Sequence, residues 1–285
     1  MNPLAAMLVG VATISFSGIL VKTAGVDPAV AALHRCGWAL PVLALLAWRS
    51  PGRGARGIAL IAGVLLAVDL IAWHVAIGRI GAGLATVLAN TQVLFVAAIG
   101  ALFLHQRIGA RTAGAIAIVL CGVALIGGVG AGRVDVALAG ILLGVLAAAT
   151  YAGFLLLYER AGRESGSLPS TLLWATTGAA AVCAVAVAAR GTSPIVSWEA
   201  TGWLVLLALS SQVIGWLLLA RGLGGMGTLA ASVLLLLQPV CTTIWGVLLL
   251  GEDIARSQAL GIAVVLAGVA LARSAMPSTA ATIPE

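Results

Sequence analysis

The chain contains very few charged residues. Asp, Glu, Lys and Arg together make up 8% of its 285 residues, and only nine are acidic. Hydrophobic residues make up 62%, and the mean hydropathy is +1.16. A soluble domain of this size must cover its surface with polar groups, and this sequence has too few of them. The composition therefore excludes a soluble globular protein and predicts an integral membrane protein.

Several motifs that would indicate catalysis or nucleotide binding are also absent. The sequence has no phosphate-binding Gly-x4-Gly-Lys-Ser/Thr loop, no His-Glu-x2-His zinc motif, no Asp-rich diphosphate motif and no Ser/His/Asp set with a nucleophile elbow. The net charge is +6, but no basic cluster is interleaved with aromatic residues, so nucleic acid is not an expected partner. An ATP-driven pump and an intramembrane enzyme are disfavoured, and we expect no cofactor or metal.

Ten apolar windows are long enough to cross about 30 Å of hydrocarbon as helices. They lie at about 4–21, 28–48, 58–77, 84–104, 110–129, 136–158, 168–189, 202–220, 227–250 and 257–272. The sequence thus predicts an all-α membrane protein with ten transmembrane helices. We expect a first five-helix unit at 1–129, a linker at 130–135, a second five-helix unit at 136–273 and a disordered tail at 274–285.

The two units resemble each other in sequence. Residues 121–125 match residues 267–271, and further matches pair Gln92 with Gln238, Asp69 with Gln212, Trp73 with Trp216, and Phe16 with Tyr151. Because each unit has an odd number of spans, the second must lie upside down relative to the first. Inverted repeats are typical of carriers, in which two similar halves enclose a site and move about it.

The distribution of basic residues predicts the orientation in the membrane. Arg and Lys are more numerous in the loops on the side that carries both termini. Since cytoplasmic loops are enriched in these residues, we expect both termini to lie inside the cell. The first residues carry no positively charged segment, so a cleaved signal peptide is not expected.

With these spans and this repeat, the sequence resembles the EamA family of the drug/metabolite transporter superfamily. The resemblance covers nearly the whole chain, and the residues that carry it are Phe16–Lys22, Pro28–Arg35, Leu237–Pro239, Leu250–Ile254 and Gly261–Leu271. It implies a ten-helix carrier whose central cavity is built by spans one to four and six to nine. It also implies export of a metabolite from the cell across the inner membrane. In the first half His105-Gln106 replaces the usual Gly-Glu pair, and no proline follows Gln92.

Three ionisable residues lie at similar depth in the second and third spans. Asp69 is the only acidic residue well inside a span, and His74 and Arg35 lie near its level. A charge at this depth costs roughly 2.5–3.5 kcal/mol on insertion scales, so it normally faces a cavity or a partner. Two hypotheses follow: a cluster that binds substrate or carries a proton, or a structural ion pair between Asp69 and Arg35.

Polar residues also follow the fourth and ninth spans. Asn90 and Gln92 lie in the fourth span, and the ninth carries Gln238 followed by Pro239, which interrupts the backbone hydrogen bonds and predicts a hinge. Polar side chains on an apolar helix must face protein or water. They either line the substrate site or hold helices together at about 1 kcal/mol per bond.

The aromatic residues of the two halves form a third candidate set. The repeat-related residues near the middle of the membrane are Phe16 with Tyr151 and Trp73 with Trp216. Aromatic rings there can stack on a flat substrate or hold a cation over a ring face. Ordinary packing within the core is the alternative.

The fifth and tenth spans show small residues at every fourth position instead of polar ones. These residues are Gly109, Ala113, Ala117 and Cys121, and Ala259, Ala263 and Ala267. Small residues at this period allow helices to approach closely, so these spans are expected to be peripheral scaffold. The protein is then a monomer, or a homodimer formed through these helices.

These patterns together predict a secondary transporter that moves a small organic metabolite through the lipid bilayer by alternating access. A zwitterionic amino acid, aromatic or other, suits the site because Arg35 can attract a carboxylate and Asp69 an ammonium group. The alternative is a non-enzymatic membrane assembly or interaction protein with the same fold.

Overall fold

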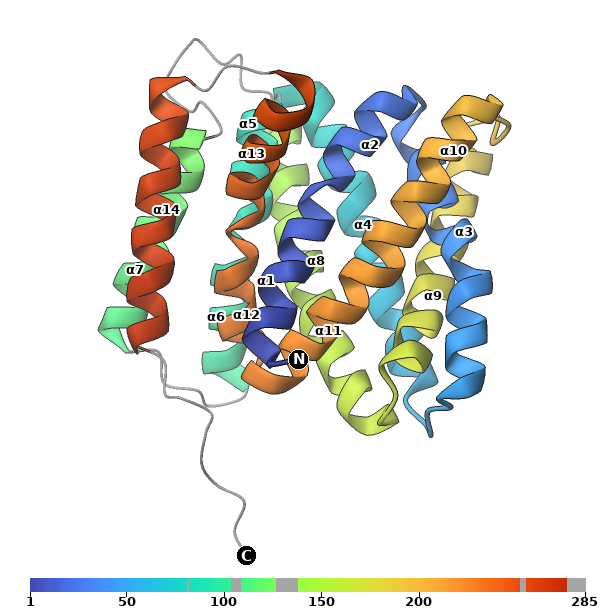
Figure 1. The fold of residues 1–285 in the computed structure, drawn as a ribbon, viewed down its shortest axis with the longest axis horizontal. Coiled ribbons are helices and arrows are strands. Elements are labelled where there is room, and N and C mark those ends of the chain that lie inside the picture. Colours follow the sequence, from blue (N-terminus) through green and yellow to red (C-terminus); the bar gives the residue numbers. More distant parts are fainter. Residues whose placement is uncertain (81, 104–108, 127–137, 252–254, 276–285) are drawn as a thin grey trace, which may run out of the picture.

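The protein is a bundle of helices that stand side by side (Figure 1). The structure, a computed structural model, describes residues 1–80, 82–103, 109–126, 138–251 and 255–275. In these ranges eight helical spans are long and apolar enough to cross a membrane, and two further apolar helices are shorter. The predicted all-α membrane fold with ten spans is thereby confirmed. The predicted linker at 130–135 lies outside the described residues, as do His105, Gln106 and nearly all of the tail.

Each half of the chain contributes five spans, some of which are divided into two or three helices. The first half consists of α1 (Pro3–Ser15), α2 (Ser17–Ala24), α3 (Pro28–Arg49), α4 (Arg56–Ile80), α5 (Ala82–Asn90), α6 (Gln92–Phe103) and α7 (Ala110–Ile126). The second consists of α8 (Leu138–Ser165), α9 (Leu168–Ala189), α10 (Trp198–Leu207), the π-helix η1 (Ala208–Gly215), α11 (Trp216–Met226), α12 (Thr228–Leu235), α13 (Gln238–Leu250) and α14 (Arg256–Ala275).

The second span of each half begins with the same signals. The Asp27 carboxylate accepts a hydrogen bond from the Ala29 amide at 2.8 Å, and Pro28 occupies the first position of α3. In the second half the Ser167 hydroxyl caps α9, whose second residue is Pro169. A capping oxygen and a proline in the first turn satisfy or remove amide groups that lack a helical partner. The two prolines thus mark equivalent positions in the two halves.

The packing of the helices follows the inverted repeat. The third span, α4, packs along α8, which is the first span of the second half. In the same way the eighth span, built from α10, η1 and α11, packs along α1 and α2. Each half thus covers the first span of the other half with its own third span, and α1 begins at the same end of the bundle at which α14 ends (Figure 1). We call this the N-terminal end.

Two pairs of glycines allow helices to approach closely. A Cβ atom on Gly63 of α4 would overlap the carbonyl group of Ala175 on α9, and one on Gly178 of α9 would overlap the carbonyl group of Leu60. At the periphery Gly122 of α7 and Gly261 of α14 face each other's backbone in the same way. Only glycine permits backbone contact of this kind.

The periodic small residues of the fifth and tenth spans do not form the contact between α7 and α14. Gly109, just before α7, and Ala113, Ala117 and Cys121 on α7 are exposed, as are Ala259, Ala263 and Ala267 on α14. The contact between α7 and α14 is instead made by Gly122, Gly261 and Gly268 with Val119 and Val265. The periodic residues therefore form an outward face, and dimerisation through it remains a prediction.

Two predicted spans contain breaks that the sequence did not indicate, and the sixth span ends later than predicted. The first span is divided at Phe16 into α1 and α2, and the fourth is divided at Thr91 into α5 and α6. The sixth span does not end at Tyr158, because α8 continues to Ser165 and buries Glu159 on the way. A polar sequence near a span end resembles a loop, although the helix continues where its polar side chains find partners within the protein.

Candidate functional site

Asp69 and Arg35 lie in the middle part of the bundle on neighbouring spans. Asp69 is on α4, about 17 Å along the helix from its last residue, and Arg35 is on α3, about 10 Å from its first residue. These two helix ends lie at the same side of the bundle, opposite the N-terminal end. The Asp69 side chain is 9% exposed, and Arg35 is half-buried. The structure thus places the two predicted charges at comparable depth.

Arg35 does not form an ion pair with Asp69. Its Nε donates a hydrogen bond at 2.9 Å to Oε1 of Gln212 on η1, and Nε2 of Gln212 donates one at 3.1 Å to the Thr176 hydroxyl on α9. Among the described residues no basic nitrogen lies within 4.0 Å of the Asp69 carboxylate, and no hydrogen-bond donor contacts it. The structural ion pair considered from the sequence is therefore not formed in this structure.

The terminal nitrogens of Arg35 remain available for a ligand. In the part of the chain that the structure describes, only Nε of the guanidinium makes a hydrogen bond. Arg35 lies within electrostatic range of Asp69 and of Tyr151 on α8. A guanidinium whose terminal nitrogens are free can bind a carboxylate with two parallel hydrogen bonds. The three side chains together form a polar centre between α3, α4 and α8.

The π-helix in the eighth span gives Gln212 its position. A π-helical turn contains more residues than an α-helical turn, so side chains four apart no longer share one face. Asp69 and Trp73 are four apart on the regular helix α4, and Gln212 and Trp216 have the same spacing on η1 and α11. The repeat-related residues therefore meet different surroundings in the two halves, although their spacing is identical.

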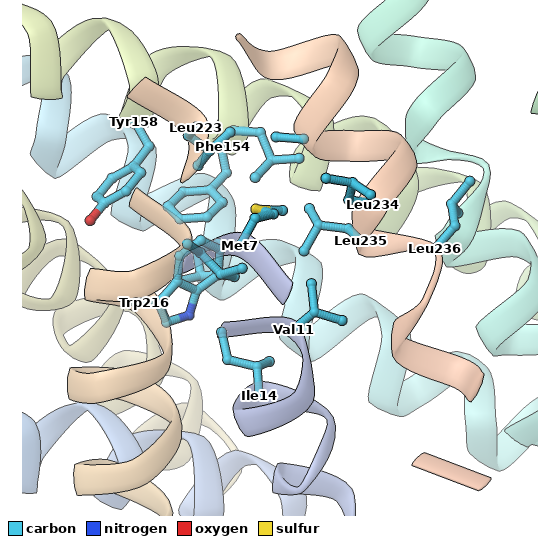
Figure 2. Packing of buried hydrophobic residues seen from close by; sticks show 14 of the residues in the cluster. Met7, Val11, Ile14, Phe154, Tyr158, Trp216, Leu223, Leu234, Leu235 and Leu236 are labelled. Carbon is cyan, nitrogen blue, oxygen red and sulfur yellow. The ribbon is translucent and has the colours of Figure 1, made fainter. Parts of the chain in front are cut away.

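The aromatic residues predicted to line the cavity belong to two different environments. Trp216 is 2% exposed and packs edge-to-face on Phe154, with ring centroids 4.8 Å apart, and on Tyr158 at 5.8 Å. Figure 2 shows Trp216 beside Phe154 and Tyr158 in the hydrophobic core, close to Met7. Tyr151 stacks on Phe154 at 6.1 Å and so joins this cluster to the polar centre.

The first-half aromatic residues are placed separately from that cluster. The Trp73 ring lies 5.0 Å from the ring of His74 and packs against Ala76, Ile80 and Ala85. No hydrogen-bond acceptor for the buried Trp73 Nε1 is present among the described residues, and the same holds for Trp216 Nε1. His74 thus contacts its neighbour in the chain and makes no ion pair within the described residues.

Phe16 lies at the break of the first span, where the backbone needs new partners. Nε1 of Trp245 on α13 donates to the Ala12 carbonyl at 3.0 Å and to the Ser15 hydroxyl at 3.1 Å, and the Thr242 hydroxyl donates to the Ser15 carbonyl at 3.2 Å. The Trp245 ring also contacts Phe16 edge-to-face at 5.9 Å. The polar face of the ninth span therefore satisfies carbonyl groups that the break releases.

The fourth and ninth spans are broken at matched positions. At the first break the amides of Thr91 and Leu94 bond to carbonyls three residues earlier, and at the second the amides of Leu236 and Leu237 do the same. Gln92 and Gln238 are the first residues of the helices that follow, α6 and α13. The sequence predicted an interruption only at Pro239, and the structure has a break in each half; the hinge role remains a prediction.

The glutamines and Asn90 at these breaks have different partners. Nε2 of Gln92 lies 3.5 Å from the Ser232 carbonyl on α12, and its buried Oε1 has no partner among the described residues. Asn90 Nδ2 donates to the Thr86 carbonyl of its own helix at 2.8 Å. Gln238 is half-buried at the start of α13. Gln92 connects the two breaks, whereas Asn90 stabilises its own helix end.

Comparison with known proteins identifies the family. The sequence profile of the EamA-like transporter family matches residues 2–128 and again residues 138–274.

The chain belongs to the EamA-like transporter family.

A solved crystal structure of another protein has the same fold as this chain, with a TM-score of 0.80 and 16% sequence identity, over 97% of this chain and 98% of the other. No curated protein has a matching sequence. The family match confirms the resemblance found in the sequence, and the chain is a membrane transporter of the drug/metabolite type.

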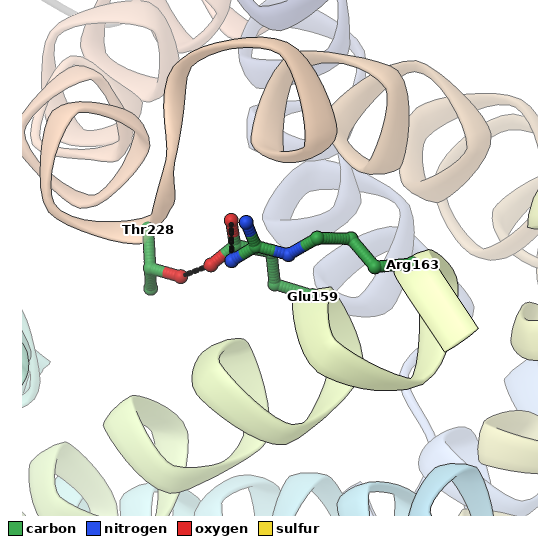
Figure 3. Close-up of polar contacts among 3 residues, drawn as sticks. All are labelled: Glu159, Arg163 and Thr228. Atoms are coloured by element: carbon green, nitrogen blue, oxygen red, sulfur yellow. Dashed lines mark hydrogen bonds and ion pairs between the residues drawn. The ribbon is translucent and has the colours of Figure 1, made fainter. Parts of the chain in front are cut away.

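A second polar cluster lies near the N-terminal end of this EamA bundle and was not found from the sequence. Figure 3 shows Glu159 between Arg163 and Thr228, with one carboxylate oxygen bonded to each. Glu159 is 7% exposed, and the cluster connects α8 to the first residue of α12. A small cavity of about 90 Å³ lies beside it and is lined by Tyr158, whose buried hydroxyl has no partner among the described residues.

Two signals in the sequence point to this cluster in retrospect. Glu159 and Arg163 are four residues apart, which places them on one helical face. Tyr151, Phe154 and Tyr158 lie three and four residues apart on α8, which is the spacing of a buried aromatic stripe. Within the described residues no group of His, Cys, Asp and Glu side chains is arranged to hold a metal ion.

Proposed function

We propose that this EamA transporter moves a small zwitterionic metabolite of the amino-acid class out of the cell by alternating access. The observation that carries the proposal is the pair of opposite charges in the middle of the membrane that do not bind each other. The terminal nitrogens of Arg35 are free to bind a substrate carboxylate. The Asp69 carboxylate has no hydrogen bond among the described residues, so it can bind a substrate ammonium group. Charges at this depth are costly, so they are retained where they bind a ligand.

The aromatic residues beside this centre support an apolar or aromatic substrate side chain. Tyr151 lies within electrostatic range of both charges, and its ring stacks on Phe154. Trp216 and Tyr158 extend the buried aromatic cluster further from the centre. A ring or an aliphatic chain of the substrate would pack against Tyr151 while its charged groups bind Arg35 and Asp69.

The proposed location is the inner membrane with both termini in the cytoplasm. Exposed arginines gather at the N-terminal end of the bundle, namely Arg49, Arg53, Arg56, Arg160, Arg163 and Arg221. This distribution supports a cytoplasmic N-terminal end. Trp48 and Trp198 are 77% and 92% exposed near opposite ends of the bundle, as expected of aromatic residues at the membrane interfaces.

Transport in proteoliposomes tests this proposal. Purified protein is reconstituted into liposomes that are loaded with unlabelled amino acids of several classes. Exchange with labelled amino acid outside the liposomes is then measured. We expect Asp69→Asn and Arg35→Gln each to reduce exchange by at least roughly tenfold, because a hydrogen bond to a charged group contributes about 1.5–3 kcal/mol. Asp27→Asn is the matched control, since Asp27 pairs with Arg190 at the bundle surface.

The assay also separates transport from an assembly or interaction role. An assembly protein would tolerate Asp69→Leu and Arg35→Leu with unchanged binding of its partner and would show no exchange in the wild type. Exchange that is equal in wild type and in both charge variants would contradict the proposed site.

A further inference from the structure

Gln212, which the sequence matched to Asp69 in the repeat but did not predict as a site residue, connects the two halves at the polar centre. It accepts a hydrogen bond from Arg35 of the first half at 2.9 Å and donates one to Thr176 of the second half at 3.1 Å. Gln212 is 1% exposed. Its amide is neutral, so it fixes the guanidinium of Arg35 without neutralising the charge.

Arg35, Asp69, Thr176 and Gln212 form two repeat-related pairs at and beside this centre. Arg35 and Thr176 each lie about two helical turns after the proline in the first turn of their helix, Pro28 in α3 and Pro169 in α9. Asp69 and Gln212 each lie about one turn before the repeat-related tryptophans of the third and eighth spans. Asp69 is therefore the equivalent of Gln212, and Arg35 is the equivalent of Thr176.

The two halves adopt different conformations at these positions. The third span is a regular α-helix through Asp69, whereas the eighth has a π-helix around Gln212. The third span also packs more extensively on α9 than the eighth span packs on α3. In a carrier built from inverted repeats, exchanging the conformations of the two halves gives the state that opens to the other side of the membrane. The observed asymmetry is what such an exchange requires.

Exchange of the two conformations predicts a new partner for Arg35. Gln212 now contacts Thr176 of its own half and Arg35 of the other half. In the exchanged state Asp69 takes the equivalent place, in contact with Arg35 of its own half and Thr176 of the other. We infer that Gln212 is a positioning residue for Arg35. When the carrier opens to the opposite side of the membrane, Arg35 exchanges its partner Gln212 for Asp69. The inference rests on the proposed transport by alternating access.

This exchange gives the charge of Arg35 a role in substrate release. While Gln212 holds Arg35, the guanidinium retains its charge and can bind a substrate carboxylate. When Asp69 pairs with Arg35, the two charges neutralise each other. Neither is then free to bind the carboxylate or the ammonium group of a zwitterion. Binding is therefore favoured in the described state and release in the exchanged state.

Distances between spin labels on the two ends of the bundle test the inference. One pair of labels is placed at Arg53 and Gly224, at the N-terminal end, and a second at Ile195 and Arg79, at the opposite end. All four sites are exposed, and the two pairs occupy equivalent loops and helix ends of the two halves. The labels are attached to cysteines introduced into a protein whose four native cysteines are replaced. The relative populations of the two distance distributions are measured for each variant in lipid nanodiscs.

Two substitutions of Gln212 should act in opposite directions. Gln212→Leu removes the hydrogen bond to Arg35 and should reduce the population of the described state by roughly tenfold or more. Gln212→Glu has nearly the same shape and adds an ion pair with Arg35, so it should raise that population. Asp69→Asn weakens the partner in the exchanged state and should act in the same direction as Gln212→Glu. Ser211→Ala, one residue away, is the control and should leave the distribution unchanged.

The outcomes distinguish this inference from the proposed function. Shifts of Gln212→Leu and Gln212→Glu in the same direction would indicate a purely structural role and overturn the inference, whatever the transport assay shows. A different result is that the wild type exchanges no amino acid while the label populations of the variants shift as predicted. This result would refute the proposed substrate class but support the exchange of partners at Arg35.

Discussion

The cluster of Glu159, Arg163 and Thr228 provides a quantitative test because its two bonds should differ in strength. Nη2 of Arg163 lies 2.7 Å from the Glu159 carboxylate, but the Arg163 side chain is 68% exposed. Water screens such a pair, and i,i+4 pairs on helices contribute about 0.3–0.5 kcal/mol. The Thr228 hydroxyl also donates to Glu159, and here both residues are buried. A buried hydrogen bond to a charged group contributes about 1.5–3 kcal/mol.

We therefore expect Thr228→Val to lower the free energy of unfolding by about 1.5–3 kcal/mol, and Arg163→Gln to lower it by less than about 1 kcal/mol. Valine keeps the shape of threonine and removes only the donor. The measurement is unfolding of the detergent-solubilised protein by increasing fractions of dodecyl sulfate, followed by intrinsic tryptophan fluorescence. Arg160→Gln is the matched control, because Arg160 and Glu164 form an exposed pair of the same spacing at 2.8 Å.

A double-mutant cycle separates the contact from other effects of the substitutions. Glu159→Gln in the Thr228→Val background should cost less than Glu159→Gln alone, since the hydroxyl partner is already missing. If Arg163→Gln destabilises the protein more than Thr228→Val does, the exposed ion pair dominates the cluster. Burial would then not determine which of the two bonds is stronger.

Three further results are expected from the packing and the topology. Gly63→Leu should prevent normal folding or lower the unfolding free energy by more than about 1–3 kcal/mol, because the added side chain overlaps α9. Gly57→Ala is the control, because its added methyl group meets no neighbouring atom. Unfolding in detergent measures both variants. Trp216→Ala should cost about 3–5 kcal/mol in the same assay, and Trp216→Phe clearly less, since the indole N–H has no partner among the described residues. Reporter fusions at Arg53 should score cytoplasmic and those at Arg190 external; the same result at both would contradict the inverted topology.

The sequence was sufficient to predict the fold because the signals are strong and repeated. Long apolar windows define the spans, and the odd number of spans in each half requires the inversion. Asp69 and Arg35 could be found because charges inside apolar spans are costly and rare. Their depth follows from the helical rise, and the structure places both in the middle part of the bundle.

The partners of these charges could not be predicted from the sequence. Pairing Arg35 with Asp69 assumes that opposite charges at equal depth attract, but the π-helix in the eighth span brings Gln212 to Arg35 instead. A π-helix leaves no clear pattern in the sequence, because it depends on tertiary packing. Glu159 was missed for another reason. Its polar neighbours resemble a loop at the membrane surface, and only its contact with Thr228 on a distant span accounts for its burial.

The paired breaks show that one structural feature can arise from different chemistry in the two halves. In the ninth span Pro239 lacks an amide hydrogen and cannot continue the helical bonding pattern. In the fourth span no proline is present, but the Thr91 hydroxyl donates to the Leu88 carbonyl at 2.6 Å and Asn90 Nδ2 donates to the Thr86 carbonyl. Such side chains compete with the backbone for helical hydrogen bonds. A side-chain bond can be released and formed again, whereas a proline cannot regain an amide, so we expect that only the first-half break is able to close into a regular helix.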